Sequence, residues 1–286
     1  SAWLKCHHLD AFLAALLNSQ PMGFYAPAQL VRDARAHGVQ VLPVDVLHSS
    51  WESTLEGGQG EGLHPNVPTG LRLDMPTGLR LDMPTGMRPV RLGLNRILGL
   101  AEADAQRLLA ARAALAPGEG FASVEDLARR AALDAHALQL LAQADALHGL
   151  ASHRHQAAWA VRGIDARATP LLQATRTHEA PARLAAPGPA QAMLADYRST
   201  GLSLDAHPLA LLRPQLAAFQ VMPAAALLHS RNGQLARASG LVTHRQRPET
   251  AKGVVFVTLE DETGAVNVIV WPAVAQAQRT PLLAAT

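Results

Sequence analysis

Basic side chains gather between two predicted strands near the C-terminal end of the sequence. Arg245, Arg247 and Lys252 lie in one short stretch. Guanidinium groups bind phosphate oxygens through paired hydrogen bonds, and an ammonium group binds them as a point charge. Phe256 and Trp271 lie in the flanking strands, where a ring either stacks on a nucleic-acid base or fills the interior. We predict a phosphate-binding loop contacted through Arg245, Arg247, Lys252 and Phe256, and both alternatives stay open for the rings.

A second stretch has the spacing of a small-residue hairpin between two helices. Residues 97–101 read Ile-Leu-Gly-Leu-Ala and precede a helical pattern that ends near Arg112. Such a turn lets backbone amides and the N-terminus of the next helix approach a DNA phosphate without reading bases. We predict sequence-independent DNA contacts at Gly99, Leu100, Ala101 and Arg112. Ala101 stands where helix-hairpin-helix motifs usually have a second glycine, so a plain helical turn is the alternative.

A partial second copy of this pattern follows. It combines a helix over 121–130 with a later helical run, and Asp145 occupies its turn. A carboxylate there repels phosphate, so we predict a structural role for this copy. Ser123 with Asp126 predicts an N-terminal helix cap. A glycosylase with such hairpins would need a catalytic lysine or aspartate beside a flipped base, and residues 91–165 contain no lysine.

No set of side chains in the sequence has the spacing of a catalytic or metal site. Adjacent or alternating histidines on a helix do not share one face, which argues against metal binding by His7–His8 and His153–His155. The remaining acidic candidates are Asp74 and Asp82, which are copies in a repeat, and residues 260–262, in a predicted turn. We expect these carboxylates on the solvated surface and predict no metal or other cofactor for this chain.

Length and composition limit the class of protein. The 286 residues are enough for two or three modest domains, because single cores usually stop growing near ~250 residues. A formal net charge of +2 means that any DNA contact must be local. No apolar run reaches the ~18 residues that span a bilayer, and the single cysteine, Cys6, cannot form an internal disulfide. We predict a folded, cytoplasmic protein without a membrane partner.

Changes in composition along the chain predict an α+β, multidomain and mostly helical protein of five segments. Their bounds are 1–55 (helical, then a strand), 56–90 (a Pro- and Gly-rich loop or insertion), 91–165 (the hairpins), 166–234 (a connector with short helices) and 235–286 (a sheet). Within the second segment, the octapeptide Pro68–Met75 recurs at Pro76–Met83. Such short units with two breakers cannot bury a shared core, so we favour a tolerated surface insertion over a ligand-binding array.

The two ends of the chain have the clearest local patterns. Apolar spacing predicts one helix over Trp3–Leu17, a second over Ala26–His37 that stops at Gly38, and a strand over Val39–Val46. Alternating β-branched residues predict strands over Val254–Leu259 and Val266–Trp271, which form a meander with a preceding strand. A five-stranded OB barrel begins in this way. Too few residues follow Trp271 for two further strands, so we predict an incomplete OB-fold.

Several stretches resemble the error-prone branch of the bacterial C-family DNA polymerases. The most specific is Ala14–Tyr25, which reads AALLNSQPMGFY, and Asp196–Gly201, His207–Leu209 and Gly253–Trp271 follow in the family's order. The resemblance covers nearly the whole chain apart from the repeats. It implies a carboxy-terminal portion that comprises the end of the fingers domain, tandem helix-hairpin-helix motifs, a connector and a partial OB-fold. It also implies that Lys5 faces template or nucleotide, with a solvated helix face as the alternative.

The resemblance implies a function as well. Family members are DNA-directed DNA polymerases, nucleotidyltransferases that perform damage-induced, mutagenic translesion synthesis. Their palm carboxylates hold two metal ions. We see no such set here and expect this chain alone to be inactive, with Mg²⁺ and deoxynucleoside triphosphates used by the parent protein. Expected partners are primer-template and single-stranded DNA, the sliding clamp, and Y-family-like and RecA-like accessory proteins. The alternatives are a non-catalytic protein-docking module and a stand-alone repair enzyme.

Overall fold

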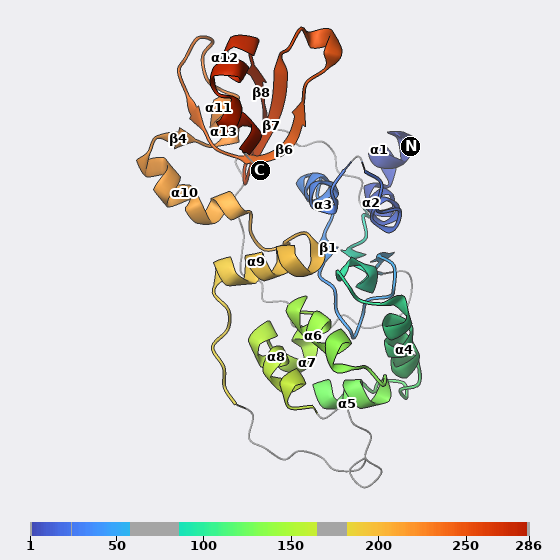
Figure 1. The fold of residues 1–286 in the computed structure, drawn as a ribbon. Helices are drawn as coiled ribbons and strands as arrows, with labels where there is room; N and C mark the ends of the chain where they lie inside the picture. The colour runs from blue at the N-terminus through green and yellow to red at the C-terminus, as the bar shows by residue number, and fades with distance from the viewer. Residues whose placement is uncertain (1, 24, 58–85, 165–181, 285–286) are drawn as a thin grey trace. The chain divides into compact units, whose positions relative to one another are not determined.

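The structure, a computed structural model, describes residues 2–23, 25–57, 86–164 and 182–284 (Figure 1). The chain divides into two compact units, Ser1–Leu204 and Asp205–Thr286. Within the described ranges, no helix is long and apolar enough to cross a membrane. The octapeptide repeats, with Asp74 and Asp82, lie outside the described residues, so their assignment as a surface insertion stays a prediction.

The first unit begins with three helices, α1 (Ala2–His7), α2 (Leu9–Asn18) and α3 (Pro27–Ala36). The prediction of one helix over Trp3–Leu17 is therefore wrong, because the backbone of His8 leaves the helical region at φ −142° and ψ 58°. The apolar stripe continues through this break, but only α2 is held by packing: it buries Leu9, Leu13 and Leu17, whereas α1 buries no residue. The predicted end of α3 is confirmed, since Gly38 follows it with a φ of +88°.

A small sheet connects this region to the rest of the first unit. Its strand order is β1 (Val41–Leu42), β3 (Val90–Arg91) and β2 (Thr54–Leu55), with β3 parallel to β1 and antiparallel to β2. The predicted strand over Val39–Val46 is thus reduced to one two-residue ladder. Pro43 explains the early end, because proline has no N–H to donate to a neighbouring strand. Beyond it, Val46 donates its amide to the carbonyl of Ala146 at 3.0 Å.

Short helices form the remainder of the first unit. They are the 3₁₀-helix η1 (Leu94–Arg96), α4 (Glu102–Ala113), α5 (Val124–Arg130), α6 (Ala135–Gln143), α7 (His148–Ala151), α8 (Arg154–Arg162) and α9 (Pro189–Thr200). The apolar faces of η1 and of α4 to α8 share one core with α2, α3 and the small sheet. Fully buried leucines dominate it, including Leu108, Leu127, Leu138, Leu141 and Leu147. This packing holds the segments around Gly99 and Asp145, the two predicted hairpin turns, in place.

The predicted cap of α5 is confirmed. The hydroxyl of Ser123 accepts a hydrogen bond from the amide of Asp126 at 3.1 Å, and the Asp126 carboxylate accepts one from the amide of Ala122 at 3.2 Å. Burial alone would raise the pKa of Asp126, but hydrogen bonds from Arg130, the Ala122 amide and Arg129 hold it below its ordinary value. The cap therefore favours the ionised carboxylate.

Removal of this cap is expected to lower the free energy of unfolding by about 1 kcal/mol in Ser123→Ala, because one amide at the start of α5 loses its acceptor. Ser123→Thr keeps a hydroxyl at the same atom and serves as the control. Urea denaturation of the whole chain measures both. Equal stability of the alanine and threonine variants would show that the hydroxyl contributes nothing.

The second unit combines helices with two sheets. Its elements are α10 (Pro208–Ala218), β4 (Val221–Met222), α11 (Ala224–Leu227), β5 (Arg237–Ala238), β6 (Leu241–Gln246), the 3₁₀-helix η2 (Glu249–Ala251), β7 (Val255–Asp261), β8 (Gly264–Val270), α12 (Pro272–Ala277) and α13 (Arg279–Ala284). β4 and β5 form a parallel pair, and β6, β7 and β8 form the predicted antiparallel meander. Val255 and Val257 are buried on one face of this meander.

Candidate nucleic-acid interface

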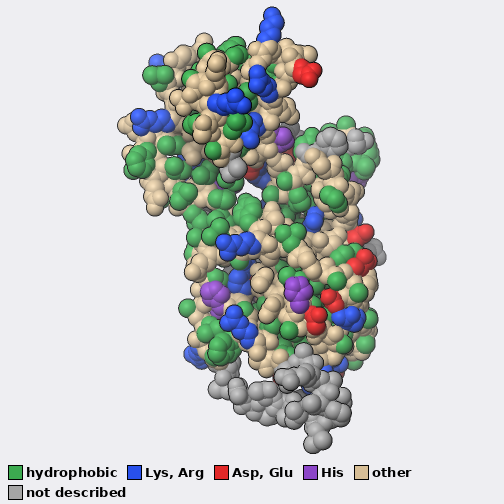
Figure 2. All heavy atoms as spheres, in the orientation of Figure 1, with side chains coloured by type: hydrophobic (Ala, Val, Ile, Leu, Met, Phe, Trp, Pro, Cys, Tyr) green, Lys and Arg blue, Asp and Glu red, His purple; other side chains and the backbone are tan. Residues whose placement is uncertain are grey.

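The predicted basic loop connects β6 to β7. Two successive residues with left-handed backbone, Lys252 at φ 48° and Gly253 at φ 87°, turn the chain back into β7. The Arg245, Arg247 and Lys252 side chains are exposed. Figure 2 shows Lys and Arg side chains gathered on the visible face of the second unit, with few acidic side chains among them. The structure therefore places Arg247 and Lys252 on one solvent-facing turn between paired strands, and Arg245 at the end of β6 next to it.

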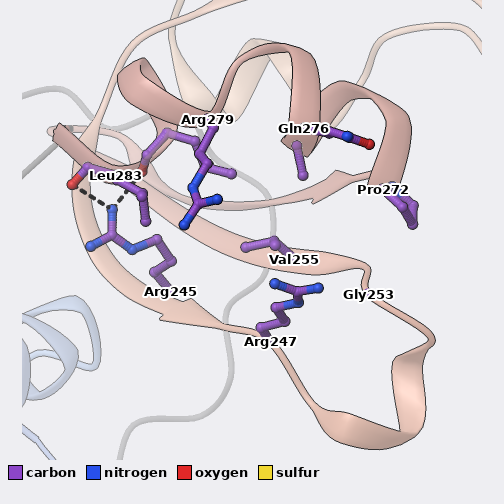
Figure 3. A pocket seen from close by; sticks show the side chains of 10 residues that line it. Arg245, Arg247, Gly253, Val255, Pro272, Gln276, Arg279 and Leu283 are labelled. Atoms are coloured by element: carbon purple, nitrogen blue, oxygen red, sulfur yellow. Dashed lines mark hydrogen bonds between the residues drawn. The ribbon is translucent and has the colours of Figure 1, made fainter.

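An open cleft of about 530 Å³ lies beside this loop, between the β6–β7 hairpin and α12–α13. Arg245, Arg247 and Arg279 line it. Figure 3 shows the guanidinium groups of Arg247 and Arg279 directed into the cleft, whereas that of Arg245 points to the end of α13. Arg245 also donates hydrogen bonds to the carbonyls of Leu282 and Leu283, so it holds the last turn of α13 against the sheet. Sequence reasoning missed Arg279, because nothing local to α13 indicates that it lies beside β6.

The two aromatic rings near the loop are exposed rather than internal. Phe256 pairs across the ladder with Ile269 on the face opposite Val255 and Val257. Phe256 is 38% exposed and Trp271, which precedes α12, is 64% exposed. Of the two alternatives, the structure therefore shows rings accessible for stacking rather than rings that fill the interior.

The first hairpin turn has the predicted backbone but an acidic border. Gly99 has a φ of +84°, Leu100 is buried and Ala101 is the N-cap of α4. Within the described part of the chain, the Gly99 and Ala101 amides donate no hydrogen bond. Glu102 and Asp104 stand in the first turn of α4. Their charges oppose the attraction of phosphate to the helix N-terminus, so the amides are available but their electrostatic setting is unfavourable.

Two other predicted DNA contacts are engaged within the protein. Arg112 donates to the carbonyls of Val46 and Ser49 at 3.2 and 2.8 Å, and burial lowers its pKa. It thereby fixes the loop between β1 and β2. Lys5 lies 2.9 Å from a carboxylate oxygen of Asp33, with both side chains about half exposed. Exposed pairs of this kind contribute little to stability, so Lys5 is held only loosely.

The acidic stretch at the β7–β8 turn corrects the expectation of a solvated surface. Asp261 is 1% exposed and its carboxylate accepts hydrogen bonds from Arg213 at 3.0 Å and from the amide of Ala224 at 2.7 Å. Burial would raise the pKa of Asp261, but hydrogen bonds from the Thr263 hydroxyl and from backbone amides outweigh it and lower the pKa. The hydrogen bond from Arg213 likewise lowers the pKa of Glu262. Through these hydrogen bonds, the buried carboxylate of Asp261 connects α10 and α11 to the sheet.

The histidine cluster at residues 153–155 is part of the hydrogen bonding of the protein itself. His153 caps α8 by accepting from the amide of Gln156, and Arg154 between the two histidines is buried in an ion pair with Asp196. Within the described ranges, no group of three or more His, Cys, Asp or Glu side chains is arranged to hold a metal ion. The described His, Cys, Asp and Glu side chains therefore do not form the carboxylate set that a two-metal polymerase centre needs.

Similarity to known proteins covers both the hairpins and the whole chain. A family model for the helix-hairpin-helix motif matches residues 38–157. Over 286 residues the chain is 52% identical to an error-prone DNA polymerase of Methylococcus capsulatus, 53% to one of Azoarcus sp. and 50% to one of Ralstonia nicotianae. These alignments cover 100%, 100% and 99% of this chain, and 26%, 24% and 24% of the relatives. The chain is homologous throughout to the error-prone DNA polymerases.

The polymerase family predicted from the sequence motifs is therefore confirmed. The chain spans about a quarter of the length of the error-prone polymerases that it matches. The helix-hairpin-helix match extends from just before β1 into α8, and so includes both predicted hairpin turns. The helix-hairpin-helix match and the basic turn both lie in sequence that aligns with the error-prone polymerases.

Proposed function

We propose that this chain is the DNA-binding, carboxy-terminal portion of an error-prone DNA-directed DNA polymerase that acts in damage-induced translesion synthesis. The observation that carries the proposal is the exposed basic stretch at the end of β6 and the following turn, with Arg245, Arg247 and Lys252. Such a stretch binds the sugar-phosphate chain by charge, without reading sequence. The exposed rings of Phe256 and Trp271 offer stacking surfaces elsewhere in the same unit. The homology and the hairpin match support the assignment of DNA as the partner.

The proposal includes a domain interpretation. Residues 1–55 form the end of the fingers domain, 56–90 an insertion, 91–165 tandem helix-hairpin-helix motifs, 166–234 a connector, and 235–286 the first strands of an OB-fold. The three-stranded meander with the basic turn between its first two strands supports the last assignment, because OB-folds bind single strands with this loop. Gly99, Leu100 and Ala101 are the proposed hairpin contacts, with Arg112 and Lys5 as secondary ones.

The whole polymerase, in this proposal, is a cytoplasmic nucleotidyltransferase that uses Mg²⁺ and deoxynucleoside triphosphates. In this proposal its catalytic carboxylates lie in the part of the polymerase that does not align with this chain. The sliding clamp and the Y-family-like and RecA-like accessory proteins are the proposed protein partners, together with primer-template and single-stranded DNA. For this chain the proposed role is to hold the strand while the chemistry takes place elsewhere.

The double variant Arg247→Ala/Lys252→Ala is expected to weaken the salt dependence of single-strand binding. Loss of two phosphate contacts should reduce the slope of log K against log salt by about 1.4, at ~0.7 per contact. Arg245 is left unchanged because it also holds α13. Fluorescence anisotropy of a labelled oligothymidylate, titrated at a series of NaCl concentrations, measures the slope.

The matched control is Arg183→Ala/Arg231→Ala, which removes the same charge from two exposed positions of the proposed connector, outside the loop. Its slope should stay close to that of the unaltered chain. Identical slopes for the two double variants would remove the β6–β7 loop from the proposal. Absence of any DNA binding by the unaltered chain at low salt would overturn the proposed function itself.

A further inference from the structure

Residues 196–201 are among those that resemble the polymerase family, and the proposed DNA contacts do not include them. They form the last turns of α9 and its C-cap, in a segment predicted to be a connector. In the structure α9 belongs to the first unit and contacts α6, the helix that precedes the second predicted hairpin turn (Figure 1). The end of α9 therefore lies among the elements of the hairpin region.

The C-terminal end of α9 is bonded to the first hairpin turn. The last four carbonyl groups of a helix have no partner within that helix, and one of them here is the carbonyl of Ser199. It accepts a hydrogen bond from the Leu98 amide at 2.7 Å. The helix ends directly afterwards because Gly201 has left-handed backbone, with a φ of +75°. Within the described part of the chain, this is the one backbone hydrogen bond that joins residues 97–101 to a segment distant in the sequence.

Buried polar contacts fix this end of α9 in the first unit. Arg154 of α8 is 9% exposed, donates to a backbone carbonyl of α9 at 2.8 Å and forms an ion pair with Asp196. The other carboxylate oxygen of Asp196 accepts a hydrogen bond from the Ser203 hydroxyl at 2.8 Å. Just beyond, Arg35 of α3 donates to the carbonyl of Leu204. The segment is thus tied to two other helices, one on each side of its hydrogen bond to the hairpin turn.

The turn held in this way carries the amides of Gly99 and Ala101, which donate no hydrogen bond to the described residues. Hydrogen bonds weaken steeply as the donor turns away from the acceptor, so these amides bind a phosphate only if the turn is held in one orientation. The buried side chain of Leu100 anchors one part of the turn. The side chain of Leu98 is 53% exposed, and its anchor is the backbone bond to α9.

We propose that Arg154, Asp196 and Gly201 are positioning residues for the DNA contact of the first hairpin. They fix the end of α9, whose Ser199 carbonyl orients the turn and its two available amides. The inference rests on the proposed function, which takes those amides as phosphate contacts. It makes the end of α9 part of the DNA-binding module, although the three positioning residues act through the turn and not on the strand itself.

The variants Gly201→Val and Gly201→Asn of the whole chain test the proposal. A Cβ at Gly201 meets nothing within 4 Å, so the two variants differ in their tolerance of a positive φ, which asparagine accepts and a β-branched residue does not. Gly201→Val should speed hydrogen exchange of the Leu98 amide, measured by NMR. It should also weaken binding of a short blunt DNA duplex by about tenfold, the loss of one hydrogen bond to a charged group. Gly201→Asn should keep both values close to those of the unaltered chain.

Ser123→Ala is the matched control, because it removes the cap of α5 in the same unit and leaves α9 unchanged. It should bind the duplex normally in spite of its lower stability. Asp196→Asn removes the charge that pairs with Arg154 and gives a second variant if Gly201→Val does not fold. It should show the same faster exchange at Leu98 and the same weaker duplex binding.

Faster exchange at Leu98 with unchanged duplex affinity would overturn the inference, because α9 would then hold the turn without serving DNA. Unchanged exchange in Gly201→Val and Asp196→Asn, or an equal loss of affinity in Ser123→Ala, would do the same. Oligothymidylate binding by the unaltered chain, measured in parallel, separates the two proposals. A chain that binds only the oligonucleotide keeps the proposed function through the β6–β7 loop and loses the inference. A chain that binds neither DNA contradicts the proposed function itself, and the inference with it.

Discussion

Gly93→Ala is expected to destabilise the first unit by about 3 kcal/mol, because overpacking at a position that cannot relax reaches this magnitude. An added Cβ would lie 2.6 Å from the backbone nitrogen of Ser53, and closer still to the backbone of Trp51 and Glu52. These neighbours are main-chain atoms and cannot rotate away. They are also fixed by hydrogen bonds, since Gly93 donates to the Ser53 hydroxyl at 3.1 Å and the Leu94 amide donates to the Ser50 carbonyl at 2.9 Å.

Gly188→Ala is the matched control for this variant. Gly188 and Gly93 both precede a helix, with φ and ψ of −67° and 160° against −76° and 158°. A Cβ at Gly188 meets nothing within 4 Å, so this variant reports the change of residue type without the clash. Urea unfolding followed by ¹⁹F NMR of 5-fluorotryptophan separates the units, with Trp159 reporting the first and Trp271 the second. Equal loss of stability at Trp159 in the two variants would contradict the steric argument.

Structural features whose causes lie within a few residues follow from the sequence. The end of α3 at Gly38, the Ser123 cap and the β7–β8 hairpin each depend on neighbours along the chain, and all three were predicted. The basic turn belongs to the same class. Arg247 and Lys252 lie between two β-branched runs, and Gly253 follows Lys252 directly. This local pattern is enough to predict an exposed connection between strands that carries both side chains.

Features whose causes lie far along the chain were missed. The break at His8 follows from the packing of α2 and not of α1, which periodicity alone does not show. Asp261 stands in a stretch of acidic and turn residues that is typical of solvated surface, and only Arg213 and the start of α11 make it a buried hub. The same limit hid Arg279, which lines the cleft only because α13 lies beside β6. Predictions of the site from sequence therefore identify the loop but not the surface opposite it.

Asp261→Asn is expected to destabilise the second unit by about 3 kcal/mol at neutral pH, because it removes the buried charge that accepts hydrogen bonds from Thr263 and the Ala224 amide and pairs with Arg213. The pKa of Asp261 is lowered in the folded state from an ordinary value of 3.8. A carboxylate with a lowered folded pKa contributes its full stability above the unfolded pKa and loses it as the pH falls through the folded pKa. The difference between the unaltered chain and Asp261→Asn should therefore be constant above about pH 5 and shrink below pH 4.

The Trp271 fluorine resonance, followed through urea unfolding at pH 7, 5 and 3, measures this difference in the unit that contains Asp261. Asp205→Asn removes an exposed carboxylate from the same unit and should change its stability by less than about 0.5 kcal/mol at any of these pH values. Because Arg213 also bonds Glu262, whose pKa is likewise lowered, the unaltered chain should itself lose stability over this acid range. A destabilisation by Asp261→Asn that stays the same from pH 7 to pH 3 would mean that the asparagine fails through its shape, and that the charge of Asp261 does not hold α10 and α11 to the sheet.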